Sequence, residues 1–279
     1  MKATHPKIAV IGSKGYLGSR LLKNLSLFFD NVKEVDKHNL SNLLNCLDEC
    51  SVIIWCAGLS NHELGKKDPW LDMQLNAIDI IKAAYHLKAK HTLIHLSSTC
   101  IYGNSSGIVN EDSLVVPLEP QAYSKVYAEH MLDHIAKIRG FRLLHFRSSA
   151  VVGDKSVGEP LSFLEKILIN DANKKITKVY GGKQRPCNFT PINDFLNCMQ
   201  NLIKLDDWSC NKLNLATHQI NFGKLASKFE IDFIDSKILD SLKIENLYWN
   251  RLNLMHNSYT DTLNYLHELQ NELKKRFTI

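Results

Sequence analysis

The sequence lacks any long hydrophobic run. None of its apolar stretches approaches the roughly 18 residues that a membrane-spanning helix needs. The first residues enter an apolar strand pattern at Lys7–Ile11, and the apolar stretch there is too short for a secretion signal. We therefore expect a cytoplasmic protein that does not associate with membranes.

Metal-binding and disulfide patterns are also missing. The seven cysteines form no Cys-x-x-Cys pair, and the twelve histidines show no His-Glu-x-x-His spacing. Cys46 and Cys50 lie one helical turn apart, which is the spacing of a helix face. We expect free thiols in a reducing compartment and no metal site.

Charge of one sign is in small excess only. The formal net charge of +5 comes from scattered lysines and arginines, which argues against a nucleic-acid partner. No repeat, low-complexity tract or Pro/Gly/Ser linker is present. With 279 residues, 44% of them hydrophobic, the chain predicts a globular protein of one large or two unequal domains.

Apolar strands alternate with amphipathic helices in the first half of the chain. This pattern indicates a parallel sheet covered on both faces, an α/β Rossmann-type fold. The predicted strands are 7–11, 32–35, 52–56, 92–96 and 142–146, and the predicted helices are 17–27, 40–47, 71–87 and 123–139.

The alternation weakens near residue 150. Helices are predicted at 161–170, 194–204 and 258–277, with short strands at 176–180 and 212–215. We expect a dinucleotide-binding domain over residues 1–150 and a smaller mixed α/β substrate-binding cap over 151–279, some segments of which return to the first sheet.

A glycine-rich turn joins the first strand to the first helix. It comprises Gly12, Ser13, Lys14, Gly15, Tyr16, Leu17 and Gly18. Glycines permit a tight turn, and backbone N–H groups at a helix N-terminus can bind a pyrophosphate. In this strand–turn–helix context the turn predicts a dinucleotide site.

The GxxGxxG spacing resembles the extended short-chain dehydrogenase/reductases, the family of nucleotide-sugar epimerases, dehydratases and 4-keto reductases. Further segments match family motifs in order: Val52–Gly58 with its Ala57-Gly58 end, Asn76, Leu96–Gly103, Ser124-Lys125, Arg147–Gly153 and Gln184-Arg185 followed by Asp194. The resemblance covers most of the chain and implies a Rossmann domain with a smaller cap.

The resemblance also implies roles for several of these residues. Lys125 holds the nicotinamide ribose, Asn76 supports that lysine, and Ser98 orients the reacting sugar oxygen. Thr99 and Cys100 follow Ser98 at the substrate, where dehydratases carry an acidic residue. Eliminating water needs an acid and a base, and Thr99-Cys100 supplies neither well, which makes a 4,6-dehydratase the less favoured prediction.

The family's catalytic tyrosine is absent. Its position, four residues before Lys125, is occupied by Gln121, and Pro120 and Ser124-Lys125 fix this register. An amide does not titrate, so Gln121 can orient a substrate oxygen but cannot supply a proton. Tyr123 points about 200° around the helix from residue 121 and is no simple substitute.

Three explanations stay open. Another group transfers the proton, with Cys100, Thr99, Tyr102, Tyr123 and His62 as candidates. Alternatively, the chain catalyses a slow or different reaction with bound NAD. Or it is a catalytically disabled relative that binds cofactor or nucleotide-sugar in a regulatory role. A scaffold without cofactor is disfavoured, because it would need neither the glycine turn nor Lys125.

The cofactor prediction depends on Asp36, which ends the second strand 18 residues after Gly18. A carboxylate there can accept both ribose hydroxyls of NAD and would repel the 2′-phosphate of NADP. The short stretch up to Val52 also permits Asp36 to match an aspartate near the adenine in 4-dehydrorhamnose reductases. We favour NAD over NADP.

On the substrate side, Arg185 resembles a family arginine that contacts the nucleotide diphosphate. Ala150 stands where epimerases often carry a substrate asparagine, which weakens the case for a UDP-hexose 4-epimerase in particular. We expect an NAD(P)-dependent nucleotide-sugar 4-epimerase or 4-keto reductase. By resemblance alone we also expect a homodimer that pairs helices 71–87 and 123–139.

Overall fold

The structure, a computed structural model, describes residues 6–35, 40–103, 105, 107–205, 208, 210–234, 243–246 and 261–277. The described chain divides into two compact units. The first contains Met1–Gly103, Pro117–Arg147 and Met199–Leu213, and the second contains Asn104–Val116, Ser148–Cys198 and Asn214–Ile279. Among the described residues, no helix is both long and apolar enough to cross a membrane.

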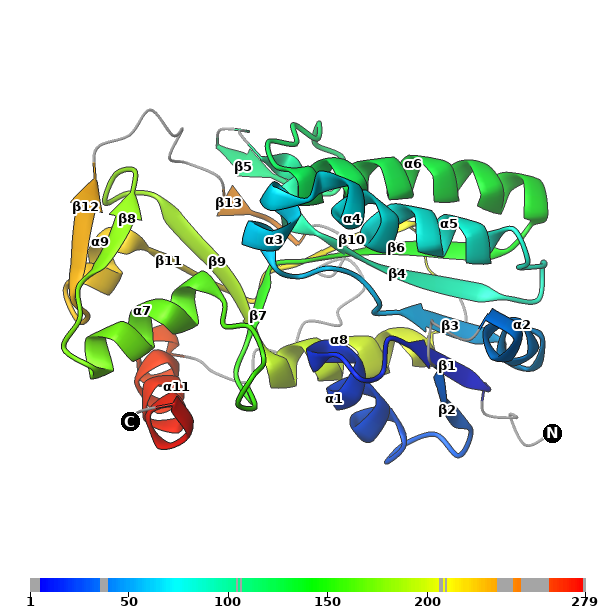
Figure 1. The fold of residues 1–279 in the computed structure, drawn as a ribbon, viewed down its shortest axis with the longest axis horizontal. Coiled ribbons are helices and arrows are strands. Elements are labelled where there is room, and N and C mark those ends of the chain that lie inside the picture. Colours follow the sequence, from blue (N-terminus) through cyan, green and yellow to red (C-terminus); the bar gives the residue numbers. More distant parts are fainter. Residues whose placement is uncertain are drawn as a thin grey trace. The chain divides into compact units, whose positions relative to one another are not determined.

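A six-stranded sheet forms the centre of the first unit (Figure 1). Its strands are β1 (Ile8–Ile11), β2 (Val32–Val35), β3 (Val52–Trp55), β4 (Thr92–Ser98), β6 (Arg142–Ser148) and β10 (Lys212–Leu215), in the order β10-β6-β4-β3-β1-β2. The pairs of β1 with β2, β1 with β3, and β3 with β4 are parallel. The predicted doubly wound α/β fold is confirmed.

The helices of this unit are α1 (Tyr16–Leu25), α2 (Leu40–Glu49), α3 (His62–Lys67), α4 (Pro69–Met73), α5 (Asp79–Ala84) and α6 (Pro120–Arg139). A π-helical turn, η1 (Gln74–Ile78), joins α4 to α5, and a 3₁₀ turn, η2 (Thr99–Tyr102), follows β4. The predicted helix 71–87 is therefore interrupted, and α3 was not predicted. Helix α8 (Ile192–Lys204) contributes its last residues to this unit.

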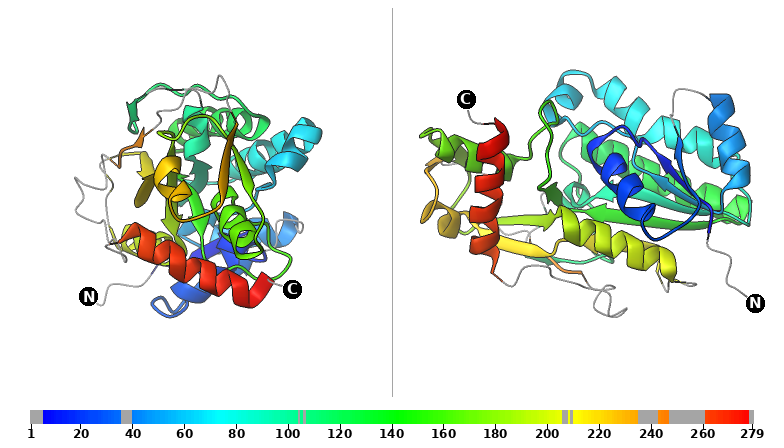
Figure 2. Two further views of the ribbon diagram at one scale, coloured as in Figure 1. Left: turned by 90° about the vertical axis from the view of Figure 1, so that its left-hand side faces the viewer. Right: turned by 90° about the horizontal axis from the view of Figure 1, so that it is seen from below.

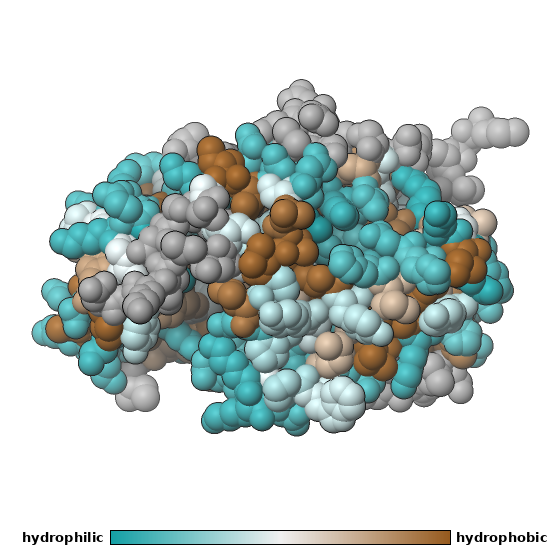
Figure 3. All heavy atoms as spheres, turned by 90° about the horizontal axis from the view of Figure 1, so that it is seen from above, coloured by the Kyte–Doolittle hydropathy of each residue, from teal (hydrophilic) through white to brown (hydrophobic). Residues whose placement is uncertain are grey.

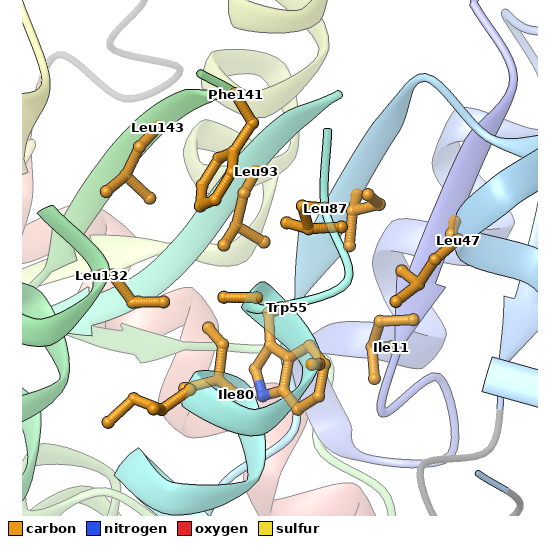
Figure 4. Packing of buried hydrophobic residues seen from close by; sticks show 14 of the residues in the cluster. Ile11, Leu47, Trp55, Ile80, Leu87, Leu93, Leu132, Phe141 and Leu143 are labelled. Atoms are coloured by element: carbon orange, nitrogen blue, oxygen red, sulfur yellow. The ribbon is translucent and has the colours of Figure 1, made fainter. Parts of the chain in front are cut away.

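Alternate residues of the strands fill two apolar layers. On one face Ile53, Trp55 and Leu93 pack with Ile80 of α5 and Leu132 of α6, as Figure 4 shows for Trp55, Leu93, Ile80 and Leu132. Strand β1 is buried at all four of its positions. Such strands carry apolar side chains on both faces because helices cover both faces of the sheet.

Three small sheets lie within the described residues of the second unit. The strands β7 (Ala150–Val152), β9 (Pro186–Pro191) and β11 (His218–Asn221) form one sheet, in which β9 pairs parallel with β7 and antiparallel with β11. The strands β8 (Thr177–Tyr180) and β12 (Ile231–Ile234) form a parallel pair, as do β5 (Ile108–Val109) and β13 (Lys243–Ile244).

The described part of the second unit also contains helices α7 (Phe163–Ala172), α9 (Phe222–Ala226) and α11 (Thr262–Phe277), together with the first residues of α8. Helix α11 packs on α7 (Figure 2). There the Gln270 amide donates to the Leu168 carbonyl and to the Asp171 carboxylate. Helices α7 and α11 and strand β8 match predicted segments, although the start of the predicted helix 258–277 lies outside the described residues. The strands β5, β7, β9, β11, β12 and β13 and helix α9 were not predicted.

Candidate active site

The turn between β1 and α1 requires its glycines. Gly12 has φ +83°, and a Cβ there would lie 2.6 Å from the Ala57 nitrogen. A Cβ on Gly18 would lie 2.2 Å from the Gly12 carbonyl oxygen. Both distances are far shorter than any real contact, so a side chain at either position would displace the backbone.

The same turn fits the diphosphate of a dinucleotide. Gly15 is the N-cap of α1 and supplies no side chain to cap the helix. Lys14 and Gly15 are exposed at this end of the helix, while Tyr16 and Leu17 are half-buried. Backbone N–H groups and the helix dipole favour an anion at such a position. The glycines let the backbone pack this closely, and the exposed N-terminus of α1 can then meet a diphosphate.

The segment after β3 is held by an asparagine and a glutamine. The Asn76 side chain accepts the Leu59 N–H at 3.0 Å and donates to the Leu59 carbonyl at 3.2 Å. The Gln121 amide donates to the same carbonyl at 2.8 Å. A Cβ on Gly58 would lie 2.5 Å from Asn76 Oδ1 and 3.8 Å from Lys125 Nζ, so these side chains converge on a glycine backbone.

Lys125 lies one helical turn after Gln121 on α6, and it is buried. Its ammonium group donates to the Leu96 carbonyl at 2.7 Å, and burial lowers the pKa of Lys125 to about 8. One of its three N–H groups is used in this bond, and the others can bind a ligand. The polar atoms of Asn76 bond to Leu59, and the support of Lys125 by Asn76 stays a prediction.

The end of β4 carries the predicted substrate residues. The Ser98 hydroxyl accepts the Cys100 N–H at 3.2 Å and caps η2, while Ser98, Thr99 and Cys100 are all half-buried. Desolvation raises the pKa of the Cys100 thiol to about 11. This thiol is therefore a poor proton donor or acceptor at neutral pH.

A buried ion pair underlies this loop. Arg147 donates two hydrogen bonds to Glu129, at 3.0 and 2.7 Å, and a third to the Tyr102 hydroxyl at 2.8 Å. Glu129 also accepts the Ser97 hydroxyl at 2.6 Å. Sequence reasoning missed Glu129, although its position four residues after Lys125 on α6 places both side chains on one helix face.

Three further predicted residues are Arg185, Asp194 and Asp36. Arg185 belongs to the second unit, where it donates to the Tyr180 carbonyl at 2.7 Å and its guanidinium lies over the Phe222 ring, 5.5 Å from the centroid. Asp194 is buried in α8 and accepts the Thr217 hydroxyl at 2.8 Å. Asp36 lies outside the described residues.

Residues 8–206 match the sequence profile described as "NAD dependent epimerase/dehydratase family". The chain belongs to this family. It is 22% identical over 221 residues to the "Uncharacterized UDP-glucose epimerase YtcB" of Bacillus subtilis (strain 168), a match that covers 67% of this chain and 69% of that protein.

Solved structures share the fold of this family member. "MoeE5 in complex with UDP-glucose and NAD" superposes with a TM-score of 0.80 at 17% identity, covering 96% of this chain and 99% of that chain. The UDP-glucuronic acid 4-epimerase from Bacillus cereus in complex with NAD gives a TM-score of 0.75 at 19% identity, covering 96% of both chains.

Proposed function

We propose that this family member is an NAD(P)-dependent nucleotide-sugar enzyme, either a 4-epimerase or a 4-keto reductase, with an atypical active site. The observation that carries the proposal is the pairing of a glycine turn that excludes side chains with a buried lysine that has N–H groups left for a ligand. The YtcB relative and the similar structures are named for UDP-sugars, which supports this substrate class.

NAD is the proposed cofactor. The turn from Gly12 to Gly18 would hold its diphosphate, Ala57 and Gly58 would lie against the dinucleotide, and Lys125 would hold the nicotinamide ribose. When bound, NAD supplies a hydride acceptor and, once reduced, a hydride donor. The two solved structures named above contain NAD, which supports NAD over NADP.

On the substrate side, the Ser98 hydroxyl would orient the reacting sugar oxygen, with Thr99 and Cys100 beside it. Gln121 would fix the Leu59 segment and at most orient the substrate, because its amide does not titrate. Arg185 would bind the nucleotide diphosphate through its guanidinium. The division into a cofactor-binding part and a substrate-binding cap is proposed on the same basis.

Turnover tests the proposal directly. The purified protein with NAD would be incubated with UDP-glucose and with UDP-glucuronic acid, and chromatography would look for the 4-epimer of each. A 4-keto nucleotide-sugar with NADH would reveal a reductase by loss of NADH absorbance. A wild type that converts neither class of substrate, while binding NAD, would contradict the proposed activity.

A second candidate is a catalytically disabled relative that binds cofactor or nucleotide-sugar for a regulatory purpose. It is favoured by the Gln121 amide, whose nitrogen is occupied by the Leu59 carbonyl. The Gln121→Tyr variant distinguishes the two candidates. If the variant creates turnover where the wild type has none, the chain is a disabled relative. If the wild type is active and the variant is slower, Gln121 belongs to a modified mechanism.

A homodimer remains a proposal. The face that carries α4, α5 and α6 shows apolar side chains among polar ones (Figure 3). On α6, Tyr123, Tyr127 and Ile138 have exposed fractions of 56%, 43% and 66%. Light scattering after size-exclusion chromatography would give the mass. A dimer that Ile138→Glu converts to a monomer would support pairing through this helix.

A further inference from the structure

The missing tyrosine leaves the proton of the reaction without a carrier, and the structure discriminates among the five candidate groups. The Tyr102 hydroxyl is fully buried and accepts from Arg147. The pKa of the Cys100 thiol is raised to about 11. Thr99 has an alcohol that does not titrate near neutral pH, and Tyr123 is largely exposed on another side of α6 than Lys125.

His62 forms a histidine–carboxylate pair with Glu119. It opens α3, and its Nδ1 lies 3.1 Å from Glu119 Oε2. The other Glu119 oxygen lies 3.0 Å from Lys66 Nζ. Burial alone would raise the pKa of Glu119, but hydrogen bonds from Lys66 and His62 hold that pKa below its ordinary value. Glu119 therefore remains a carboxylate at neutral pH.

This pair assigns the tautomer of His62. A carboxylate only accepts hydrogen bonds, so the proton of this bond is on Nδ1. In the neutral ring Nε2 then carries the lone pair, and no hydrogen bond within the described part of the chain occupies it. The side chain is 49% exposed, which leaves room for a ligand to reach it. A positioned carboxylate behind a histidine is the usual device for orienting an imidazole base.

His62 and Glu119 lie on two segments that the Gln121 hydrogen bond joins. His62 is three residues after Leu59, and Glu119 is two residues before Gln121. The hydrogen bond from Gln121 to the Leu59 carbonyl therefore ties together the two segments that carry the pair, and α3 packs on α6. Asn76 anchors the same Leu59 segment, next to the glycine on which Lys125 converges.

We propose that His62 is the catalytic acid/base of this chain and that Glu119 positions it, an inference that rests on the proposed function. In the oxidative direction the O–H bond of the sugar hydroxyl breaks and its proton forms an N–H bond at His62 Nε2. The hydride on the same carbon goes to NAD, the oxidant. The alcohol becomes a ketone, and His62 becomes an imidazolium. In the reductive direction the proton would return from Nε2 to the ketone oxygen, with NADH as the hydride donor.

Two variants test the role in turnover, with a matched control. In His62→Ala the kcat is expected to fall by about 10²- to 10⁴-fold, the range for losing a positioned acid/base. NADH affinity is expected to be unchanged, and added imidazole to restore part of the rate. Glu119→Ala is expected to lower kcat less, because the imidazole remains. His130→Gln, an exposed histidine on α6, should match the wild type.

A second readout needs neither substrate nor cofactor. Long-range ¹H–¹⁵N NMR distinguishes protonated from unprotonated imidazole nitrogens. In the free protein, at a pH where the His62 ring is neutral, the proton is expected on Nδ1 and Nε2 is expected to be unprotonated. In Glu119→Ala the proton is expected to move toward Nε2, the tautomer that an unpaired imidazole favours in water.

The outcomes separate the two proposals. Loss of turnover in His62→Ala, with binding retained and imidazole rescue, supports the role of His62. An active wild type whose His62→Ala variant keeps its kcat overturns the role of His62 and leaves the proposed function intact. A wild type that binds NADH and converts no nucleotide-sugar overturns both, and the wild-type assay alone reveals it. A neutral His62 ring in the free wild type that carries its proton on Nε2 and none on Nδ1 would overturn the positioning by Glu119.

Discussion

Removing the Arg147 guanidinium should destabilise the first unit severely. Arg147 and Glu129 have side-chain exposures of only 3% and 4%, and the pair shares two hydrogen bonds. In Arg147→Met the Glu129 carboxylate would stay buried with the Ser97 hydroxyl as its remaining partner. The Tyr102 hydroxyl would lose the hydrogen bond from Arg147 as well.

The magnitude follows from two arguments that agree. At an effective dielectric constant of about 20, unit charges ~4 Å apart attract by about 4 kcal/mol. Breaking a buried ion pair on one side costs about 3–5 kcal/mol in measured cases. We therefore expect Arg147→Met to lower the free energy of unfolding by about 3–5 kcal/mol, a large part of the roughly 5–15 kcal/mol that folded proteins have.

Urea denaturation followed by tryptophan fluorescence measures this, since Trp55 is buried in the core of the same unit. Glu129→Leu combined with Arg147→Met should cost less than Arg147→Met alone, because no unpaired charge remains. Lys88→Met, which breaks the exposed pair with Asp48, should change stability little. An Arg147→Met variant no less stable than Lys88→Met would refute the reasoning.

The same pair gives the stability of the wild type a pH dependence. Burial alone would raise the pKa of Glu129, but the hydrogen bonds from Arg147 hold it below the ordinary value of 4.5. A depressed carboxyl pKa contributes stability above the unfolded-state value and loses it as the pH falls through the folded-state value. The wild type should therefore lose stability below pH 4.5 more steeply than the double variant.

Three further predictions concern the candidate site. Gly18→Ala should abolish NADH binding and destabilise the turn, because its Cβ would lie 2.2 Å from the Gly12 oxygen. In Gly15→Ala the corresponding distance is 3.3 Å, so both effects should be smaller. Fluorescence titration measures the binding of each variant, and thermal unfolding measures its stability. Gln121→Ala should cost about 0.5–1.5 kcal/mol of stability for its lost hydrogen bond, and exposed Gln184→Ala should cost nothing measurable. With a pKa of about 11, Cys100 should be thiolate in only about one molecule in a thousand at pH 8. Its alkylation, followed by mass spectrometry, should be far slower in the native protein than in urea; equal rates would show an exposed, reactive thiol.

The inner strands of the first unit's sheet were predictable because they are buried on both faces. Such strands appear in the sequence as short apolar runs, and the predicted strands 7–11 and 52–56 contain β1 and β3. Strand β9 begins and ends with proline and is apolar at few positions, so it gives no such signal. Helix α3 is six residues long and mostly polar, and its pairing with α6 comes from tertiary contacts.

The site was predictable where a sequence motif fixes the backbone. It was not predictable where it depends on the hydrogen-bond partners of side chains. The positions of Gly12, Gly18 and Lys125 follow from spacing. Other side chains have hydrogen-bond partners on segments far away in the chain, which the sequence does not reveal. These side chains are those of Gln121, Asn76 and Arg147. The π-helical turn at Gln74–Ile78 also has no sequence signature, although such turns often mark functional positions.

The residue that replaces the family's tyrosine, Gln121, has a structural role in this chain. The position that would carry the acid/base holds a side chain whose amide joins the segments on which His62 and Glu119 lie. His62 would thus transfer the proton, and Gln121 would hold the two segments together. Gln121→Tyr is informative because it removes the amide that donates to the Leu59 carbonyl.

The measurement that tests the account most directly is a fluorescence titration of the folded protein with NADH and, separately, NADPH, comparing the wild type with Lys125→Ala. Circular dichroism would confirm that the variant is folded. We expect micromolar binding of NADH, weaker binding of NADPH, and a marked loss of NADH affinity in Lys125→Ala. A folded wild type that binds neither dinucleotide would contradict the cofactor site, and with it the proposed reaction.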